Sequence, residues 1–389
     1  MAKLIDITGR PLSGEWGKDD ENGDGIPVLR TTNFTNEGVV NYDNVVTRTI
    51  TKKNIDDKFL RKGDIIIEKS GGSDKFPVGR VIYFNGDENT YLFNNFTGLL
   101  RVKDKELWYP QYVFYSLYAN YKRGGTRIYE NKTTGLHNLK TDDYVSRYEI
   151  KEIDMVSQIS ICEKLDMMCK IVKFRKRELQ LLDELVRGRF VELFGDPVSN
   201  SYGLPEAILP ELGVFGRGVS KHRPRNDPKL LGGNYPLIQT GDIANAGLYI
   251  TSYNSTYSEF GLKQSKMWEK GTLCITIAAN IAKTAILEFD ACFPDSVVGF
   301  IANERTNNIF IHYWFSFFQA ILESQAPESA QKNINLKILS ELKVIVPEKE
   351  RQNEFANFVH RIDKSKLIVQ KELDETQLLF DSLMQEYFG

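Results

Sequence analysis

The feature that most constrains this chain is a long helical pattern that extends from about residue 153 to residue 195. It contains no proline, and good helix formers such as Leu, Met, Lys, Arg, Glu and Gln dominate it. Gly195 followed by Pro197 predicts its end. Apolar residues recur seven apart, as in a coiled-coil seam, at Leu165, Val172, Leu179, Val186 and Leu193. At 1.5 Å per residue such a helix would be about 60 Å long, which exceeds an ordinary globular core, so we expect it to separate domains.

A second helical pattern occupies residues 351–389 and resembles the first. With one offset, Ile362 and Asp363 match Leu165 and Asp166, whereas the final Phe388 matches Phe194 only after a shift of three residues. This alignment predicts that the second helix is three residues shorter. The alternative is two unrelated amphipathic helices that each pack on a domain. If the helices pack on each other, the expected seam consists of Leu165, Val172, Leu179, Leu182, Val186, Ile362, Val369, Leu379 and Leu383.

The regions that precede these helices are also duplicated. In each of them short runs of β-branched and aromatic residues alternate with turn residues. YPLIQTGDI at 235–243 matches IPVLRTTNF at 26–34, and KGTLCITIAAN at 270–280 matches KGDIIIEKSGG at 62–72. The predicted fold is therefore mixed α/β (α+β), with two duplicated domains separated by two long antiparallel coiled-coil-like helices. The expected boundaries are 1–150 and 197–347 for the domains, and 151–196 and 348–389 for the helices.

Composition excludes few classes of protein. The formal net charge of −2 gives no overall sign of a polyanionic partner, but basic residues are concentrated locally, as between Lys164 and Arg189. The four cysteines form no C-x-x-C pair and have no histidine at metal-ligand spacing, so we expect no metal site. The scarcity of cysteine and the lack of a signal peptide predict a cytoplasmic protein. No apolar run approaches the length of a membrane span.

Motifs that carry chemistry are absent from the sequence. It contains no G-x-S-x-G, no H-E-x-x-H and no phosphate-cradling G-x-x-x-x-G-K. A nuclease could use Asp142 with Glu149 and Lys151, or Glu341 with Lys343, but acidic-x-Lys triplets are frequent by chance in a chain that is 26% charged. We therefore predict a binding protein without catalytic residues, and a stand-alone nuclease stays open as an alternative.

Polar and basic loops are the candidate binding elements of both domains. Lys, Arg, Ser, Thr, Asn and His are the residue types that contact phosphates and base edges of DNA. The candidates of the first domain are Lys69, Ser70, Ser73, Lys75, Arg80, Arg123, Arg127, Lys132, Thr133 and His137. Those of the second domain are Lys221, His222, Arg223, Arg225, Asn280, Lys283, Lys332 and Asn333. Two such clusters in each domain, in equivalent places of a duplicated scaffold, favour a face that reads DNA.

Three stretches carry a family resemblance that extends over essentially the whole chain. LLDELVRGRFVELFGDP closely resembles the central spacer helix of type I restriction–modification specificity subunits. VGRVIYF with FNNFTGLL, and NINLKILSELKVIVPEKERQNEFANFV, look like that family's target-recognition-domain frame and its exit into a spacer helix. The loops of both domains depart from any fixed pattern, which leaves each DNA contact to be tested individually.

The resemblance implies a function and a set of partners. Each domain would be a target-recognition domain, and the protein would bind a bipartite, asymmetric site in double-stranded DNA with a fixed gap. Its partners would be two modification subunits that carry S-adenosylmethionine and methylate adenine, and a restriction subunit that uses ATP and Mg²⁺. The specificity subunit itself would hold no cofactor and no catalytic residue. A protein scaffold without DNA affinity remains the other alternative.

Overall fold

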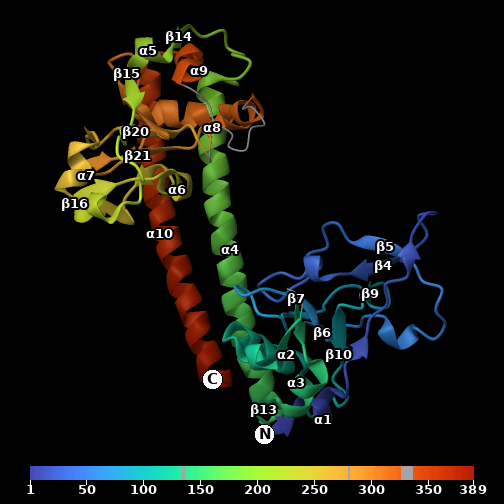
Figure 1. Ribbon diagram of the computed structural model, residues 1–389. Helices are drawn as coiled ribbons and strands as arrows, with labels where there is room; N and C mark the ends of the chain where they lie inside the picture. The colour runs from blue at the N-terminus through green and yellow to red at the C-terminus, as the bar shows by residue number, and fades with distance from the viewer. Residues whose placement is uncertain (134–135, 279–280, 326–335) are drawn as a thin grey trace. The chain divides into compact units, whose positions relative to one another are not determined.

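The computed structural model describes residues 1–133, 136–278, 281–325 and 336–389. It divides into two compact units (Figure 1): unit 1 comprises Met1–Lys176 with Lys371–Gly389, and unit 2 comprises Arg177–Gln370. Each unit mixes helices with β-sheets, so the predicted fold class is confirmed. The unit boundaries fall inside the two long helices, and the four predicted segment boundaries therefore stay a prediction. No helix among the described residues is long and apolar enough to span a membrane.

The described residues of unit 1 form one short strand pair, three sheets and three short helices, besides parts of two long helices. β1 (Ala2–Lys3) pairs with β13 (Glu149–Ile150). The main antiparallel sheet has the order β2 (Leu12–Ser13), β10 (Thr97–Leu100), β6 (Ile65–Glu68) and β8 (Val81–Tyr83). The second sheet has the order β3 (Lys18–Asp19), β5 (Val46–Thr49), β4 (Ile26–Leu29) and β9 (Leu92–Phe93), and the third β11 (Glu130–Thr133), β12 (Leu136–Leu139) and β7 (Ser70–Gly72). The helices are α1 (Leu4–Thr8), α2 (Pro110–Lys122) and α3 (Thr141–Arg147), with 3-10 turns at η1 (Thr31–Asn33), η2 (Asp56–Lys58) and η3 (Gly125–Tyr129).

The described residues of unit 2 repeat the strand pair and the first two sheets of unit 1, with a fifth strand in the main sheet. β14 (Glu206–Ile208) pairs with β24 (Lys343–Ile345). The main sheet has the order β15 (Gly213–Arg217), β23 (Val297–Ala302), β20 (Leu273–Thr276), β21 (Thr284–Leu287) and β17 (Tyr249–Ile250). The second sheet has the order β18 (Ser255–Tyr257), β16 (Leu231–Leu237), β22 (Ala291–Cys292) and β19 (Met267–Trp268). The helices are α5 (Leu209–Leu212), α6 (Thr240–Asn245), α7 (Glu259–Lys263), α8 (Asn308–Gln325) and α9 (Leu336–Glu341), and η4 (Pro228–Leu230) is a 3-10 turn.

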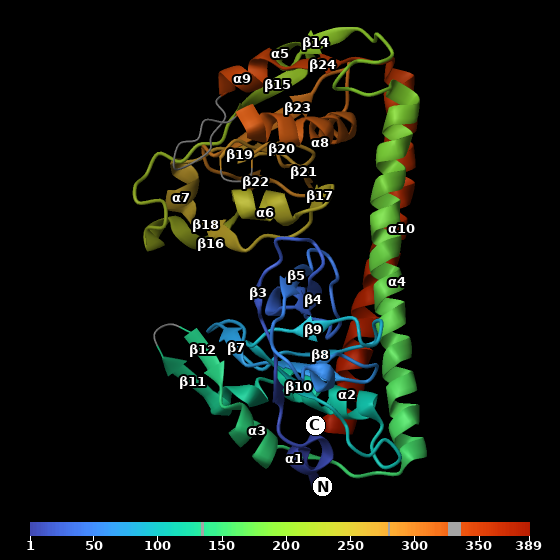
Figure 2. The same ribbon diagram turned by 90° about the vertical axis from the view of Figure 1, so that its right-hand side faces the viewer.

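The duplicated sequence runs form equivalent central strands. In β6, Ile65 and Ile67 belong to one apolar cluster and Ile66 to another, because alternate side chains of a strand point to opposite faces of the sheet. In β20, Leu273 and Cys274 are divided between two clusters in the same way. Both strands are buried on both faces, which explains their nearly continuous apolar sequence. Figure 2 shows α8 against the main sheet of unit 2.

The two long helices are α4 (Met155–Phe194) and α10 (Lys349–Phe388), as Figure 1 shows. Each contains 40 residues, so the prediction of two long helices is confirmed, and the prediction that the second is shorter is wrong. Their first residues and their last residues are each 194 positions apart. The sequence match of Ile362 with Leu165 implied a different offset and is therefore displaced by nearly one helical turn.

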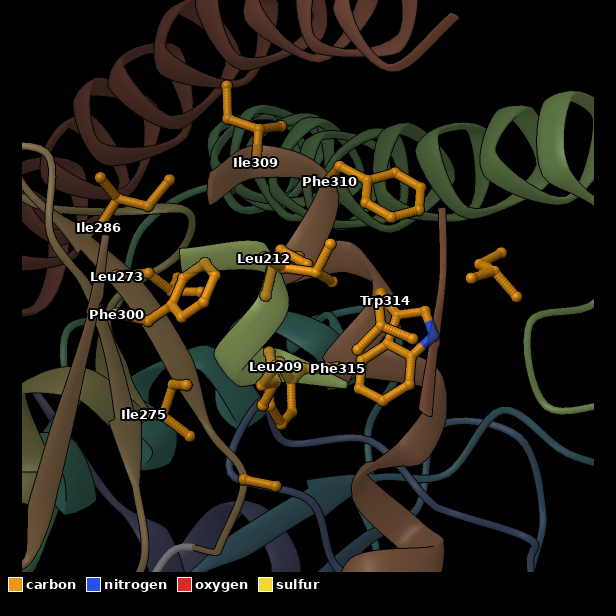
Figure 3. Packing of buried hydrophobic residues seen from close by; sticks show 14 of the residues in the cluster. Leu209, Leu212, Leu273, Ile275, Ile286, Phe300, Ile309, Phe310, Trp314 and Phe315 are labelled. Carbon is orange, nitrogen blue, oxygen red and sulfur yellow. The ribbon is translucent and has the colours of Figure 1, made fainter. Parts of the chain in front are cut away.

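The ends of the long helices contribute to the core of each unit. In unit 2, Phe190 of α4 stacks on Phe310 of α8 at 5.4 Å between ring centroids and meets Phe355 of α10 edge-on at 5.3 Å. Figure 3 shows the adjoining core, which Phe310 and Trp314 of α8 share with the strand residues Leu273 and Phe300. In unit 1 the long helices contribute Cys162, Leu165, Phe380 and Met384 to the core.

Within each unit the two helices run antiparallel, as predicted. In unit 2 Arg189 of α4 pairs with Glu354 at 2.6 Å, and Asp183 pairs with Lys366. In unit 1 Arg175 pairs with Glu372 at 2.6 Å. Of the predicted seam, Leu165, Val186 and Val369 are buried, and Val172, Leu179, Leu182, Ile362 and Leu383 are half-buried.

Leu379 is the incorrect member of the predicted seam. Its side chain is 49% exposed, whereas the neighbouring Phe380 is 7% exposed and belongs to the core of unit 1. The prediction of Leu379 followed from its match with Leu182. The observed helix bounds instead place Phe380 at the position of the buried Val186, 194 residues earlier. Side-chain burial thus follows the structural offset of 194 residues between the helices and not the best match of residue types.

A buried glutamine fixes the start of each long helix in the same way. The side-chain amide of Gln158 donates to the carbonyls of Leu107 and Ile153, both at 2.9 Å, and its oxygen accepts from the Tyr109 backbone N–H at 2.8 Å. Gln352 donates to the carbonyls of Arg305 and Pro347 and accepts from the Thr306 hydroxyl at 2.9 Å. Both side chains are fully buried and lie 194 positions apart. This repeated contact was not predicted from the sequence.

Candidate nucleic-acid interface

Four of the cations in unit 1 gather around one pocket of about 410 Å³, which we call the basic pocket. It is lined by Asn36, Lys75, Phe76, Pro77, Tyr121, Lys122, Arg123, Gly124 and Arg127. Lys75, Arg123 and Arg127 were predicted as DNA contacts, and they come from two loops that are distant in sequence. The pocket lining includes no carboxylate residue. Tertiary folding therefore concentrates positive charge that the overall net charge conceals.

The end of α2 positions this group. Lys122 is the last residue of α2, and Arg123 caps the helix. Gly124 then adopts a left-handed conformation with φ +74, which ends the helix and turns the chain into η3. The Arg127 guanidinium in η3 donates to the Asp74 carbonyl at 3.1 Å and so connects the two loops. Cations in the last turn and at the cap of α2 also interact favourably with the negative end of the helix dipole.

The cations of the basic pocket have aromatic and carbonyl neighbours. The Lys75 ammonium lies 5.4 Å from the centre of the Phe76 ring, and the Lys122 ammonium lies 5.9 Å from that of Tyr118. Arg123 donates to the carbonyl of Phe388 at 2.6 Å. Within the part of the chain that the structure describes, none of the four cations forms an ion pair with a carboxylate. Their charge is consequently available to an anion from outside the unit.

Arg80, a predicted DNA contact, points inward instead. Its guanidinium donates to the carbonyls of Phe34 and Thr31, both at 2.9 Å, and lies 3.4 Å from a carboxylate oxygen of Glu68. Burial raises the pKa of Glu68, and the charge of Arg80 opposes this rise. These contacts give Arg80 a structural role in holding η1 against β6 and β8. They argue against its assignment as a DNA contact.

The remaining candidates of unit 1 are absent from the lining of the basic pocket, and the side chains of two of them are not described. The Lys69 ammonium bonds the Ser13 hydroxyl at 3.1 Å, and burial lowers the pKa of this lysine. His137 is 7% exposed, and its Nδ1 lies 3.3 Å from a carboxylate oxygen of Glu130. Ser70 lies in β7, and the Ser73 hydroxyl accepts from the Phe76 backbone N–H at 3.1 Å, which shapes the loop. The backbone of Lys132 and Thr133 lies in β11, but their side chains are outside the described set.

The basic loop of unit 2, Lys221 to Arg225, differs from the basic pocket of unit 1 because its arginines pair with a carboxylate. Arg223 and Arg225 both pair with Asp295, at 3.6 and 2.5 Å. The ring of His222 bonds Asp227 at 2.9 Å, and the backbone N–H of Lys221 donates to the Gln264 side chain at 2.7 Å. The side chains of Arg223 and Arg225 remain about half exposed, at 54% and 49%. Asp295 therefore competes with any external anion for two arginines.

The basic loops of the two units do not occupy equivalent places in the fold. The loop with Lys221 to Arg225 follows β15, the counterpart of β2. The corresponding stretch of unit 1, residues 14–25, is acidic instead, with five carboxylates in GEWGKDDENGDG. The prediction of equivalent clusters is thus corrected for this loop. Lys283 is half-buried after β20, and Asn280, Lys332 and Asn333 lie outside the described residues.

The residues of the alternative nuclease site have ordinary surface surroundings. Glu341 pairs with Lys337 at 3.8 Å, and Lys343 approaches Glu206 at 4.0 Å. Asp142, Glu149 and Lys151 are exposed. Across residues 1–133, 136–278, 281–325 and 336–389, no group of three His, Cys, Asp or Glu side chains is arranged to hold a metal ion.

Comparison with known proteins relates this chain to one family. The model of the family described as type I restriction modification DNA specificity domain matches residues 213–377. The whole chain is 19% identical to the MjaX type I restriction enzyme specificity subunit assigned in Methanocaldococcus jannaschii, with 97% of this chain and 89% of that protein covered. The resemblance to type I specificity subunits that the sequence indicated is therefore confirmed.

Two solved structures share the fold along the entire chain. One is the S subunit of a type I restriction–modification system from M. genitalium, with a TM-score of 0.57, 16% identity, and coverage of 100% of this chain and 95% of that one. The other comes from work on complex assembly and conformational transition of a type I system, with a TM-score of 0.58, 14% identity, and coverage of 100% and 96%. Both the M. jannaschii relative and the M. genitalium structure are named as specificity or S subunits.

Proposed function

We propose that this type I specificity subunit binds a bipartite, asymmetric site in double-stranded DNA, with one half-site read by each unit. The observation that carries the proposal is the difference in surface charge between two units built on one framework. A shared framework with unlike loops suits two different half-sites. Bipartite recognition with a fixed gap is what the family resemblance implies.

The same proposal assigns the chemistry to partner subunits. Two modification subunits would carry S-adenosylmethionine and methylate adenine, and a restriction subunit would use ATP and Mg²⁺. This chain would hold the partners at the DNA site and would supply no catalytic residue and no cofactor. The long helices α4 and α10 are the candidate elements for setting the gap between the half-sites.

Mapping of N6-methyladenine by long-read sequencing tests the proposal in cells with and without the gene. We expect a motif of two short half-sites with a fixed gap, which disappears when the gene is deleted. If the complex with modification subunits shows no sequence preference in a binding-site selection, the proposal is wrong. Magnesium-dependent cleavage by the chain alone would instead support the nuclease alternative.

A further inference from the structure

We propose that the basic pocket of unit 1 binds the sugar-phosphate backbone of DNA and contacts two neighbouring phosphates. This inference deepens the proposed function and rests on it. Lys75 and Lys122 would neutralise the phosphates, while Arg123 and Arg127 would add directed N–H donors. The pocket would fix the position of unit 1 on the duplex and would not itself read the sequence.

Charge is the first argument. Four cations line a pocket of about 410 Å³ that has no acidic residue in its lining. Like charges that line one pocket repel one another, which costs free energy unless an anion enters between them. An anion with several oxygens relieves the repulsion and displaces the counterions of the DNA, which is the main source of affinity for a polyanionic backbone.

The exposed aromatic ring in the pocket lining is the second argument. Phe76 leaves 52% of its surface exposed between Lys75 and Pro77, although a large apolar side chain on a loop gains nothing from contact with water. The repeating unit of a DNA backbone combines charged phosphate with apolar deoxyribose. An exposed ring beside lysines fits that alternation, and the Asn36 side chain at the rim is of a type that contacts phosphate and sugar oxygens.

The pocket is also organised before a ligand arrives. Arg127 is held by the Asp74 carbonyl and Arg123 by the Phe388 carbonyl, while the turn at Gly124 sets the direction of both. Ser73 and Phe76 close the opposite loop through a backbone hydrogen bond of 2.6 Å. Because these groups are already ordered, binding requires little further loss of conformational entropy. Lys75 and Lys122 are exposed and have no ion-pair partner among the described residues, so they are the best sites for variants.

The test uses the full chain in complex with its modification subunits. Fluorescence anisotropy measures binding of a duplex with the mapped motif and of a scrambled duplex over a range of salt concentrations. The variants are Lys75→Gln, Lys122→Gln and the double variant, and Lys105→Gln is the control because Lys105 is exposed in unit 1 outside the pocket. Each single variant should lower the slope of log K against log salt by about 1, and the double variant by about 2. Affinity should fall by the same factor on both duplexes.

The outcomes separate the pocket from the proposed function. A double variant with the salt slope of the wild type would refute backbone binding by the basic pocket. A loss of affinity confined to the motif duplex would also refute it, and so would weaker subunit assembly with unchanged DNA binding. If the wild type fails to prefer its motif but the double variant still loses slope, the pocket stands and the sequence-recognition proposal fails. A loss as large for Lys105→Gln would show a diffuse charge effect and would also contradict the pocket.

Discussion

Unit 1 and unit 2 share a framework but hold their exposed cations differently. In unit 1 the cations of the basic pocket have carbonyl and aromatic neighbours, whereas in unit 2 Arg223 and Arg225 share the carboxylate of Asp295. The framework itself is conserved down to the buried Gln158 and Gln352. Duplication therefore preserves buried contacts of the framework, whereas the surroundings of the exposed cations differ between the units. A formal net charge of −2 says nothing about either surface.

The largest expected effect tests whether the two units are stabilised by equivalent helix positions. Phe380→Ala removes a ring that is 7% exposed from the core of unit 1, and we expect a loss of about 3–5 kcal/mol in the free energy of unfolding of this unit. The matched control Leu379→Ala should cost less than about 1 kcal/mol, because that side chain is 49% exposed. Hydrogen exchange resolved to peptides measures both. Equal losses for the two variants would refute the corrected seam.

Acid should weaken unit 2 through His312, a group without an equivalent in unit 1. Burial lowers the pKa of His312 to about 4, and its Nδ1 lies 2.9 Å from the Thr284 hydroxyl. The unfolded chain binds the proton near pH 6.5, so stability is complete above that pH and is lost as pH falls toward 4. The shift corresponds to about 3 kcal/mol.

The change His312→Gln isolates this contribution from the carboxylates that titrate over the same range. We expect the variant to be less stable than the wild type at pH 7 and to lose less stability between pH 6.5 and pH 4. Chemical denaturation at each pH, followed by hydrogen exchange of peptides from unit 2, provides the measurement. Parallel pH profiles for the two proteins would contradict the assignment.

The shared framework predicts equal sensitivity at its two glutamines. Gln158→Ala and Gln352→Ala each remove three hydrogen bonds that a fully buried side chain makes to backbone or hydroxyl partners. We expect each to destabilise its own unit by about 2–3 kcal/mol, as judged by local hydrogen exchange. Exposed Gln377→Ala is a control of the same residue type, with little expected effect. A large loss in only one unit would break the equivalence of the two frameworks.

Sequence alone predicted what depends on local periodicity. The heptad rows gave both long helices and most of the seam, and the runs with Ile65 to Ile67 and Leu273 to Ile275 gave the central strands, because alternation along one element reports its burial. The register between the two repeats was predicted incorrectly, because Ile362 was matched with Leu165 on residue similarity and not on burial. The sequence alone also could not show which basic side chains point outward. Arg80 folds inward onto the carbonyls of η1, which are distant in sequence.

The smallest expected effect sharpens the electrostatic comparison between the units. Asp295→Asn removes the carboxylate that holds Arg223 and Arg225, and the proposed DNA binding should strengthen. Partly exposed ion pairs contribute about 0–1 kcal/mol, so the gain should not exceed about fivefold, with a steeper salt dependence. Glu269→Gln removes the same charge from an exposed position of unit 2 and is the matched control. An equal gain from both variants would mean that only the net charge of the unit matters. No gain from either would mean that these arginines stay away from DNA, and unit 1 would then provide most of the salt-dependent affinity.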